Sequence, residues 1–298
     1  MSRFTVAAAQ YPIDRLGSWA DYVAKLERWV GEAAAGGAAL AVFPEYGAME
    51  LAALDPATMG DLAGSLASVA ALAPQVDALH AALAARHGIH LLAATMPVHL
   101  GGMHYVNRAR LFAPNGRMGW QDKLVMTRFE REQWHVAAGG PLHLFQTALG
   151  PIGVTICYDS EFPLLARALV EAGAEILLVP SCTDSLQGYW RVRIGAQARA
   201  LEGQMIAIQA PTVGKAAWSP AVDVNRGAAG VYGPPDGDFP TDGVIAAGVE
   251  GAPQWLFAEI DLAALGAVRQ TGAVRGVAHW PEQPGAAPLP PVRPIDLR

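Results

Sequence analysis

The chain has 298 residues, of which 52% are hydrophobic and only 16% charged. With 21 Lys and Arg against 27 Asp and Glu, its net charge is −6, and it has no basic run, which argues against nucleic acid or an anionic membrane as partner. This length fits one large α/β domain or two average ones. Average soluble domains carry about 25% charged residues, so the apolar excess predicts an extensive core or interface, and we expect an oligomer.

The amino-terminal and longest apolar segments predict a soluble, cytoplasmic protein. Gln10 and Asp14 interrupt the first apolar stretch too early for a signal peptide. The longest apolar stretch, 33–44, contains glycine and is shorter than the roughly 18 residues that a membrane span needs. Two cysteines, Cys157 and Cys182, cannot form a disulfide framework, so each is expected to be buried or reactive.

The first part of the chain alternates predicted strands and helices. An apolar segment, 4–11, predicts a strand, and Ser18 is a predicted N-cap of an amphipathic helix that ends near residue 35. A short apolar run, 40–43, predicts a buried strand that leads to Glu45. Ligand sites in α/β sheets lie outside the carboxyl ends of strands, so Glu45 is well placed for a site.

An Asn-Gly pair marks a predicted hairpin. Asn115 and Gly116 stand between two strand-like runs, and such a pair is the strongest short hairpin signal, because both turn residues adopt positive φ. Lys123 therefore follows a hairpin strand. The predicted elements from residue 56 to residue 156 are one or two helices within 56–87 and strands over 89–96, 108–113, 117–123, 142–146 and 152–156.

Cys157 is predicted to lie in a turn between a strand and a helix. Pro163 fits the first position of a helix that ends near residue 172. A thiol at a helix start faces the positive end of the helix dipole, which lowers its pKa and raises the thiolate fraction. Free Cys is otherwise among the most buried residue types, so the alternative is an inert core thiol.

The second half continues the alternation and contains one long irregular segment. Residues 210–243 are rich in Gly and Pro and too long for a plain connector, which predicts a functional cover. The Pro-rich residues 279–298 predict an extended arm, suited to an oligomer interface, after a single domain over 1–278. The other predicted elements are strands over 176–179, 204–209, 244–249 and 255–260, and helices over 190–202 and 262–269.

Familiar metal, phosphate and serine-hydrolase motifs are missing from the sequence. It has no Gly-x-Ser-x-Gly, Gly-x-Gly-x-x-Gly, His-Glu-x-x-His or Cys-x-x-Cys. The eight His residues are scattered, although His87 with His90, or His99 with His104, could in principle pair on a metal. We therefore expect no metal and no cofactor.

Glu45 and Lys123 each have an ordinary interpretation as solvated surface residues. Glu45 follows an apolar strand, however, and a buried carboxylate without a partner would cost several kcal/mol. Lys123 is one of only three lysines and leads into an apolar segment. If Glu45 and Lys123 both lie beside Cys157, each charge would have the other as its partner.

Three segments, taken in order, resemble the Glu, Lys and Cys signatures of the nitrilase superfamily of carbon-nitrogen hydrolases. They are VFPEYG (42–47), DKL (122–124) and GVTICYD (153–159), and RALE (199–202) extends the resemblance over nearly the whole chain. The resemblance implies an α/β fold of the nitrilase type, a four-layer αββα sandwich. It also implies that no cofactor is needed.

The resemblance implies roles for the site residues as well. Cys157 would be the nucleophile and Glu45 the general base, while Lys123 and the backbone N–H of Tyr158 would stabilise the developing negative charge. Glu130 best matches the family's second glutamate, and Glu132 is the fallback. The predicted substrate-binding residues are Tyr158, Glu161, Ser181 and Cys182.

Glu161 departs from the family pattern, which often has Arg at this position. An acidic group there either selects a cationic or amine-bearing substrate or makes a local ion pair. The predicted function is hydrolysis of a small amide, to a carboxylate plus ammonia or an amine, through a Cys thioester. Nitrile or N-carbamoyl hydrolysis, acyl transfer to an amine and a non-catalytic binding role stay open. The predicted partners are a small amide or nitrile and further copies of the chain in a homodimer or higher homo-oligomer.

Overall fold

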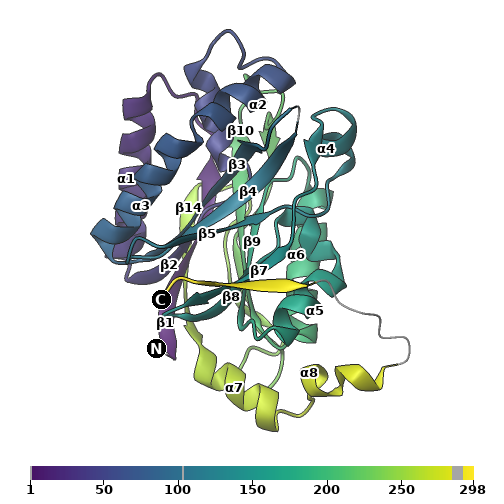
Figure 1. Ribbon diagram of the computed structural model, residues 1–298. Helices are drawn as coiled ribbons and strands as arrows, with labels where there is room; N and C mark the ends of the chain where they lie inside the picture. Colours follow the sequence, from purple (N-terminus) through teal and green to yellow (C-terminus); the bar gives the residue numbers. More distant parts are fainter. Residues whose placement is uncertain (1, 103, 284–290) are drawn as a thin grey trace.

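The computed structural model describes residues 2–102, 104–283 and 291–298, with strands in the middle and helices on two sides (Figure 1). The strands are β1 (Arg3–Pro12), β2 (Ala38–Val42), β3 (His90–His99), β4 (Tyr105–Phe112), β5 (Met118–Asp122), β6 (Val136–Ala137), β7 (Leu142–Thr147), β8 (Gly150–Val154), β9 (Ile176–Ser181), β10 (Ile206–Lys215), β11 (Val224–Asn225), β12 (Gly230–Tyr232), β13 (Val244–Ala247), β14 (Gln254–Asp261) and β15 (Val292–Asp296). The α-helices are α1 (Trp19–Ala35), α2 (Leu62–Ala71), α3 (Ala73–His87), α4 (Arg128–Glu132), α5 (Pro163–Glu171), α6 (Leu186–Glu202), α7 (Leu262–Thr271) and α8 (Gly276–His279), and the 3-10 helices are η1 (Gly47–Leu54), η2 (Cys157–Glu161) and η3 (Trp280–Glu282).

The strands form two halves that meet where β1 pairs with β10. The first half has the order β14-β1-β2-β3-β4-β5, and the second has the order β15-β7-β8-β9-β10, with β12 and β13 beyond β10. The parallel β1–β10 pairing is short and joins Tyr11 and Pro12 to Thr212 and Val213. In Figure 1, α1 and α3 lie beside the first half and α5 and α6 beside the second.

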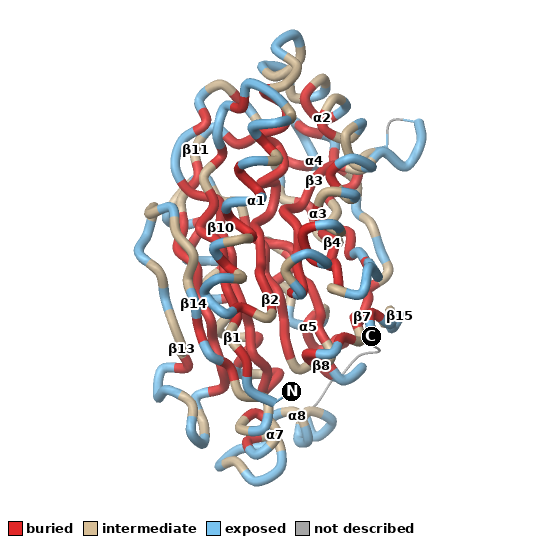
Figure 2. The backbone as a smooth tube through the Cα atoms, turned by 90° about the vertical axis from the view of Figure 1, so that its left-hand side faces the viewer, coloured by how far each residue is buried: buried red, intermediate tan, exposed pale blue. Residues whose placement is uncertain are grey.

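Alternate residues of β1 face two different cores. Val6 and Ala8 pack in a cluster with strands of the second half, α5 and α6. Ala7 and Ala9 pack in a cluster with α1 and α3. Such alternation places helices on one face of the first half and the second half on its other face, as in the predicted four-layer sandwich. The predicted fold class is confirmed, and Figure 2 shows the strands as largely buried.

Two helices begin where a serine caps the first turn. The Ser18 side chain accepts a hydrogen bond from the N–H of Asp21, which confirms the predicted start of α1. Helix α6 begins at Leu186, earlier than the predicted Trp190, because the Ser185 side chain accepts a hydrogen bond from the N–H of Gly188. The cap adds a turn that brings α6 to the edge of the cavity described below.

The predicted cover over 210–243 is wrong in its first part. Strand β10 continues to Lys215, because it pairs with β9 as far as Pro211 and with β11 at its end. Residues 230–232 form β12, which is also buried. Only the middle of the segment, 220–224, reaches the cavity.

The Asn-Gly hairpin turn differs from the prediction. Gly116 has a φ of 84°, but Asn115 does not adopt positive φ. The N–H of Gly116 donates to the carbonyl of Ala113 at 3.1 Å, so Pro114 and Asn115 form the centre of the turn. Pro114 fixes its own φ near −65°, which fits this position, and Gly116 then completes a three-residue loop.

The Pro-rich arm ends as a strand at the edge of the second half. Residues 292–296 form β15, which pairs in parallel with β7 of the same chain. Residues 284–290 of the predicted arm lie outside the described residues. The division into 1–278 and 279–298, and the arm's place in an oligomer interface, stay predictions.

Helices α2 and α3 are the most membrane-like part of the described chain. Within the described ranges, no single helix is long and apolar enough to cross a membrane. Together, α2 and α3 have the length and the apolar composition of a membrane span, but the two helices meet at an angle of 52°. Leu66, Val69 and Leu83 of this pair are buried in the cluster beneath α1.

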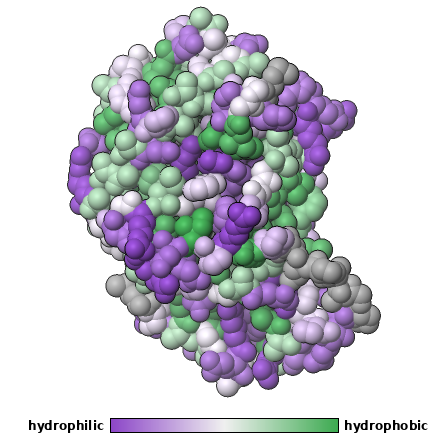
Figure 3. All heavy atoms as spheres, viewed as in Figure 1, coloured by the Kyte–Doolittle hydropathy of each residue, from purple (hydrophilic) through white to green (hydrophobic). Residues whose placement is uncertain are grey.

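Hydrophobic residues are concentrated in the interior. On the face seen in Figure 3, hydrophobic and hydrophilic residues are mixed in small groups. The core clusters instead contain apolar side chains from almost every strand. Much of the apolar excess of the sequence is therefore used in the sandwich itself.

We expect Gly116→Ala to lower the free energy of unfolding by about 1 kcal/mol, because a Cβ disfavours positive φ even where space is open. Gly60→Ala is the matched control, since Gly60 is also exposed in open space but has no positive φ, and its effect should stay within about 0.5 kcal/mol. Urea denaturation measures both. Equal effects would contradict the turn geometry.

Candidate active site

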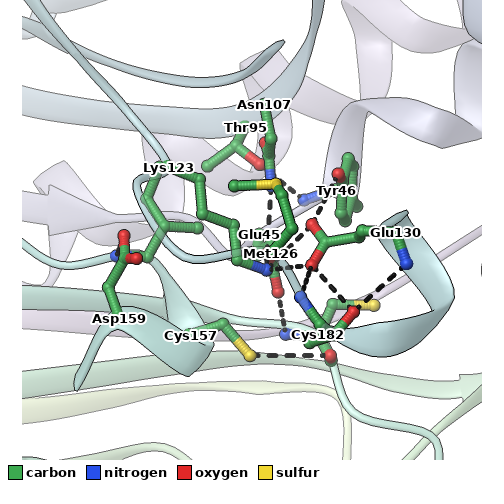
Figure 4. A network of polar contacts seen from close by, with 12 residues as sticks. Glu45, Tyr46, Thr95, Asn107, Lys123, Met126, Glu130, Cys157, Asp159 and Cys182 are labelled. Carbon is green, nitrogen blue, oxygen red and sulfur yellow. Dashed lines mark hydrogen bonds and ion pairs between the residues drawn. The ribbon is translucent and has the colours of Figure 1, made fainter. Parts of the chain in front are cut away.

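Lys123 lies between two carboxylates in the interior of the molecule (Figure 4). Its Nζ is 2.7 Å from Oε1 of Glu45 and 2.7 Å from Oε2 of Glu130, and all three side chains are at most 3% exposed. Glu45 follows β2, Lys123 follows β5 and Glu130 belongs to α4. Segments far apart in the sequence thus form one buried ion triad.

Burial and mutual charge shift the pKa of each member of this triad. Burial raises the pKa of Glu45 to about 7, although Lys123 opposes that rise. Burial acts in the same direction on Glu130, but there the Lys123 ammonium outweighs it and the pKa is lowered. Burial alone would lower the pKa of Lys123, yet the two carboxylates outweigh it and raise this pKa well above its ordinary value. Lys123 therefore stays charged, whereas Glu45 can gain or lose a proton near neutral pH.

Cys157 begins the short helix η2 and lies beside Glu45. Its φ of 50° is in the left-handed region, which side chains rarely adopt. Burial, and next the Glu45 carboxylate, raise the pKa of the Cys157 thiol well above its ordinary value. The predicted lowering by a helix dipole is wrong, because α5 begins only at Pro163 and the thiol is buried near a negative charge. The thiol is protonated at neutral pH and needs a base.

Two further donors hold the Glu45 carboxylate. The Asn107 Nδ2 donates to Oε1 at 3.0 Å, and the backbone N–H of Cys182 donates to Oε2 at 3.0 Å. Burial also raises the pKa of the Cys182 thiol to about 12, so it stays protonated. No motif in the sequence points to Asn107, which is the third residue of β4.

The carboxylate of Asp159 connects the Lys123 and Cys157 segments. It accepts hydrogen bonds from the backbone N–H groups of Val125 at 2.8 Å and of Ile156 at 3.1 Å. Burial raises its pKa to about 6, against these hydrogen bonds. Asp159 was part of the Cys signature in the sequence, but its bridging contacts could not be predicted from that.

A capping box selects Glu130 over Glu132. Thr127 caps α4, and its backbone N–H and hydroxyl each donate to Oε2 of Glu130 at 2.8 Å. Tyr46 donates its hydroxyl to the other oxygen of Glu130 at 2.9 Å. Glu132 is 55% exposed and pairs with Arg128 outside the triad. The Thr-x-x-Glu spacing is a known helix-start signal and could have identified Glu130.

These groups line a cavity of about 350 Å³. Of the four predicted substrate-binding residues, Tyr158, Glu161 and Cys182 line the cavity and Ser181 does not; their binding of substrate stays a prediction. The Ser181 hydroxyl is buried and donates to the carbonyl of Ala210 on neighbouring β10 at 3.4 Å. The remaining lining residues are Glu45, Tyr46, Lys123, Thr127, Arg128, Phe129, Glu130, Trp134, Cys157, Thr183, Asp184, Gly188, Arg191, Val192, Pro220, Ala221, Val222, Asp223 and Val224.

Glu161 forms an ion pair at the cavity wall. Its Oε1 lies 3.4 Å from Nε of Arg191, whose side chain is 59% exposed. Exposed pairs of this kind contribute little to stability, so both groups can exchange partners with a ligand. Of the two roles considered for Glu161, the local ion pair is present in the structure. Among the described residues, no group of three His, Cys, Asp or Glu side chains is arranged to hold a metal.

Comparison with known proteins places these residues in a family context. Residues 5–270 match the model of the carbon-nitrogen hydrolase family. The chain is 31% identical over 270 residues to "Probable hydrolase YhcX" of Bacillus subtilis (strain 168), covering 91% of this chain and 52% of the relative. It is 30% identical over 169 residues to a bifunctional nitrilase/nitrile hydratase, NIT4A, of Lupinus angustifolius, covering 53% and 48%. The chain spans about half the length of these relatives.

The fold is similar to that of solved carbon-nitrogen hydrolases. The structure from Helicobacter pylori G27 aligns with a TM-score of 0.71 at 20% identity and covers 94% of each chain. At this level of identity the likeness concerns the fold.

We expect Lys123→Met to lower the free energy of unfolding by about 3 kcal/mol at pH 8, because it leaves two carboxylates buried without their cation. Their pKa values then rise above those of the unfolded chain, so the folded variant binds extra protons and gains stability as the pH falls. The difference in free energy of unfolding between the variant and the unsubstituted protein should therefore be smaller at pH 5.5 than at pH 8. Urea denaturation at both pH values checks this.

Arg128→Met is the control for this prediction, because it breaks the exposed pair with Glu132 and should cost less than about 1 kcal/mol. A Lys123→Met deficit that is the same at pH 5.5 and pH 8 would argue against the buried triad.

Proposed function

The chain belongs to the carbon-nitrogen hydrolase family, and we propose that it hydrolyses a non-peptide carbon-nitrogen bond of a small amide to a carboxylate plus ammonia or an amine. One observation carries this proposal. A thiol, a carboxylate with a pKa of about 7 and a lysine ammonium lie together in one cavity. These are the groups that acyl transfer through a thioester needs.

The proposed first step is acylation of Cys157. Glu45 takes the thiol proton as the sulfur attacks the carbonyl carbon, and the carbonyl oxygen becomes an oxyanion. Lys123 and the backbone N–H of Tyr158 stabilise this oxyanion, a role whose removal typically costs about 3 kcal/mol. The carbon-nitrogen bond then breaks, the leaving nitrogen takes the proton from Glu45, and a thioester remains on Cys157.

The second step returns the thiol. Glu45 takes a proton from water, and the resulting hydroxide attacks the thioester carbonyl. The carbon-sulfur bond breaks, the acid leaves, and the sulfur regains a proton from Glu45. A group that takes and gives protons in alternate steps works best with a pKa near the working pH, and the burial of Glu45 supports that role.

Glu130 holds the cation in the proposed mechanism. It makes two contacts with Lys123 Nζ, at 2.8 and 2.7 Å, so the ammonium keeps its position while Glu45 changes its charge. Tyr158, Glu161 and Cys182, which line the cavity, are proposed to contact the substrate. Glu161 and Arg191 would meet the part of the substrate away from the scissile bond.

Nitrile hydrolysis by the same residues is the second candidate function. The relative from Lupinus angustifolius, described as a nitrilase and nitrile hydratase, favours it. A nitrile carbon would be attacked by the same sulfur, so the substrate must be identified by experiment. N-carbamoyl hydrolysis is tested with the same panel.

We also propose that the chain works as a homo-oligomer in the cytoplasm, as its composition predicts. Large apolar side chains that are exposed on α5 and α6 support the oligomer, namely Leu164, Leu186, Trp190, Ile194 and Leu201.

Cys157→Ala should abolish turnover without unfolding the protein, because it removes the sulfur that forms the thioester. The measurement is product release from a panel of small amides, nitriles and N-carbamoyl amines, with hydroxylamine added as acceptor. Intact mass should show an acyl adduct on the unsubstituted protein. Cys182→Ala is the matched control, because it removes the other thiol that lines the cavity and keeps the backbone contact with Glu45. It removes only a proposed substrate contact, so turnover should fall by no more than about tenfold and the acyl adduct should persist. Turnover by Cys157→Ala would overturn the mechanism.

For the best substrate of that panel, we expect kcat/KM to fall about tenfold per pH unit below about pH 7. Protonation of Glu45 occurs there and removes the base, so activity is lost as the pH falls. The measurement is kcat/KM between pH 5.5 and pH 8.5, with tryptophan fluorescence as the control for folding. A flat profile with an intact fold would remove Glu45 from the role of base.

A further inference from the structure

We propose that Asn107 is a positioning residue that keeps Glu45 ionised and aimed at Cys157. The proposal rests on the proposed function, because it deepens the role of Glu45 as base. Asn107 lies on β4, is fully buried and does not line the cavity, so it acts on substrate only through Glu45.

The contacts of Asn107 join two members of the site. Its side chain donates to Oε1 of Glu45 at 3.0 Å, and its backbone carbonyl accepts the N–H of Lys123 at 2.9 Å. Figure 4 shows Asn107 above Glu45, on the side opposite Cys182. One residue thus fixes the carboxylate through its side chain and the lysine through its backbone.

The orientation of the Asn107 amide, with its nitrogen toward Glu45, leaves its oxygen in an unfavourable environment. Its Oδ1 is buried and has no hydrogen-bond partner among the described residues. A buried acceptor without a partner is destabilising, so packing alone would favour an apolar side chain here. Turning the amide over would place Oδ1 against the Glu45 oxygen and remove the donor. The contact with Glu45 accounts for the orientation, and such departures from local optimum occur at functional positions.

The two oxygens of Glu45 then have different tasks. Oε1 receives Lys123 Nζ and Asn107 Nδ2, while Oε2 receives the backbone N–H of Cys182. Two donors on Oε1 hold the carboxylate plane. We assign proton transfer to Oε2, because it binds the backbone N–H of Cys182, whose carbonyl lies 3.7 Å from the Cys157 sulfur. A donor to the charged form favours ionisation, so the contact of Asn107 with Oε1 favours the ionised form of Glu45. Burial has the opposite effect and raises the pKa of Glu45.

The charged and titratable groups around Glu45 come from several elements. Lys123 favours its ionised form, whereas Glu130 opposes it. The thiols of Cys157 and Cys182 and the hydroxyl of Tyr46 are neutral at the working pH, because burial raises the pKa of each. Without Asn107, Oε1 of Glu45 would lose one of its two donors, and Glu45 would hold its proton to higher pH.

The test uses p-nitrophenyl acetate, an activated acyl donor that does not depend on the natural substrate. The rate of nitrophenol release is followed between pH 5.5 and pH 8.5 at the isosbestic wavelength, with Cys157→Ala subtracted as background. Asn107→Leu and Asn107→Ala both remove the donor, by an apolar isostere and by a shorter side chain. Gln121→Leu is the matched control, since it removes a buried amide from neighbouring β5 that contacts backbone carbonyls and not Glu45.

The acid limb of acylation should lie near pH 7 in the unsubstituted protein. In both Asn107 variants the midpoint of this acid limb should rise by about one pH unit, whereas Gln121→Leu should leave the midpoint unchanged. If the rate of the Asn107 variants falls equally at every pH and the acid limb stays near pH 7, Asn107 has only a structural role and the proposal is wrong. If the unsubstituted protein is not acylated at Cys157 at all, the proposed function itself fails.

Discussion

The site depends on the ion triad of Glu45, Lys123 and Glu130. Removing three charges from water is unfavourable unless each finds a partner at hydrogen-bond distance, and Lys123 meets this condition for both carboxylates at once. The three residues follow β2, follow β5 and lie in α4, so only a packed first half of the sandwich can bring them together. The fold and the site are therefore coupled, because the strands position the charges and the charges fix the loops after the strands.

Proton placement follows from the same burial. Burial favours the neutral forms of both Cys157 and Glu45, while Lys123 stays charged between two carboxylates. In the proposed mechanism, the thiol keeps its proton until Glu45 takes it as base. Asn107 and the Cys182 amide hold that base in one orientation, and Asp159 ties the segments that carry Lys123 and Cys157. A cavity that both stores a proton and directs its transfer suits stepwise acyl transfer.

Sequence signals were reliable where the cause was local. Ser18 caps α1 and Pro163 opens α5 where the pattern predicts, because a cap and a fixed φ act within one turn. Ser185 and Thr127 carry equally local signals that would have located α6 and Glu130. The local rule failed for Asn115, since the Pro before it shifted the turn by one residue. It failed again in 210–243, where pairing with β9, β1 and β11 continues β10 through Pro211 and Gly214.

By itself the sequence determined an alternation of strands and helices. Through its resemblance to the nitrilase superfamily it also indicated the four-layer fold, the family, and Glu45, Lys123 and Cys157 as the candidate trio, because short motifs depend on neighbouring residues. Only the tertiary structure decided the direction of the Cys157 pKa shift, which depends on burial and on a carboxylate that follows a distant strand. It also decided that Ser181 does not line the cavity and that Asn107 donates to Glu45. The physical reason is the same in each case. Burial, charge and hydrogen bonding act through space, between residues whose separation along the chain carries no local signal.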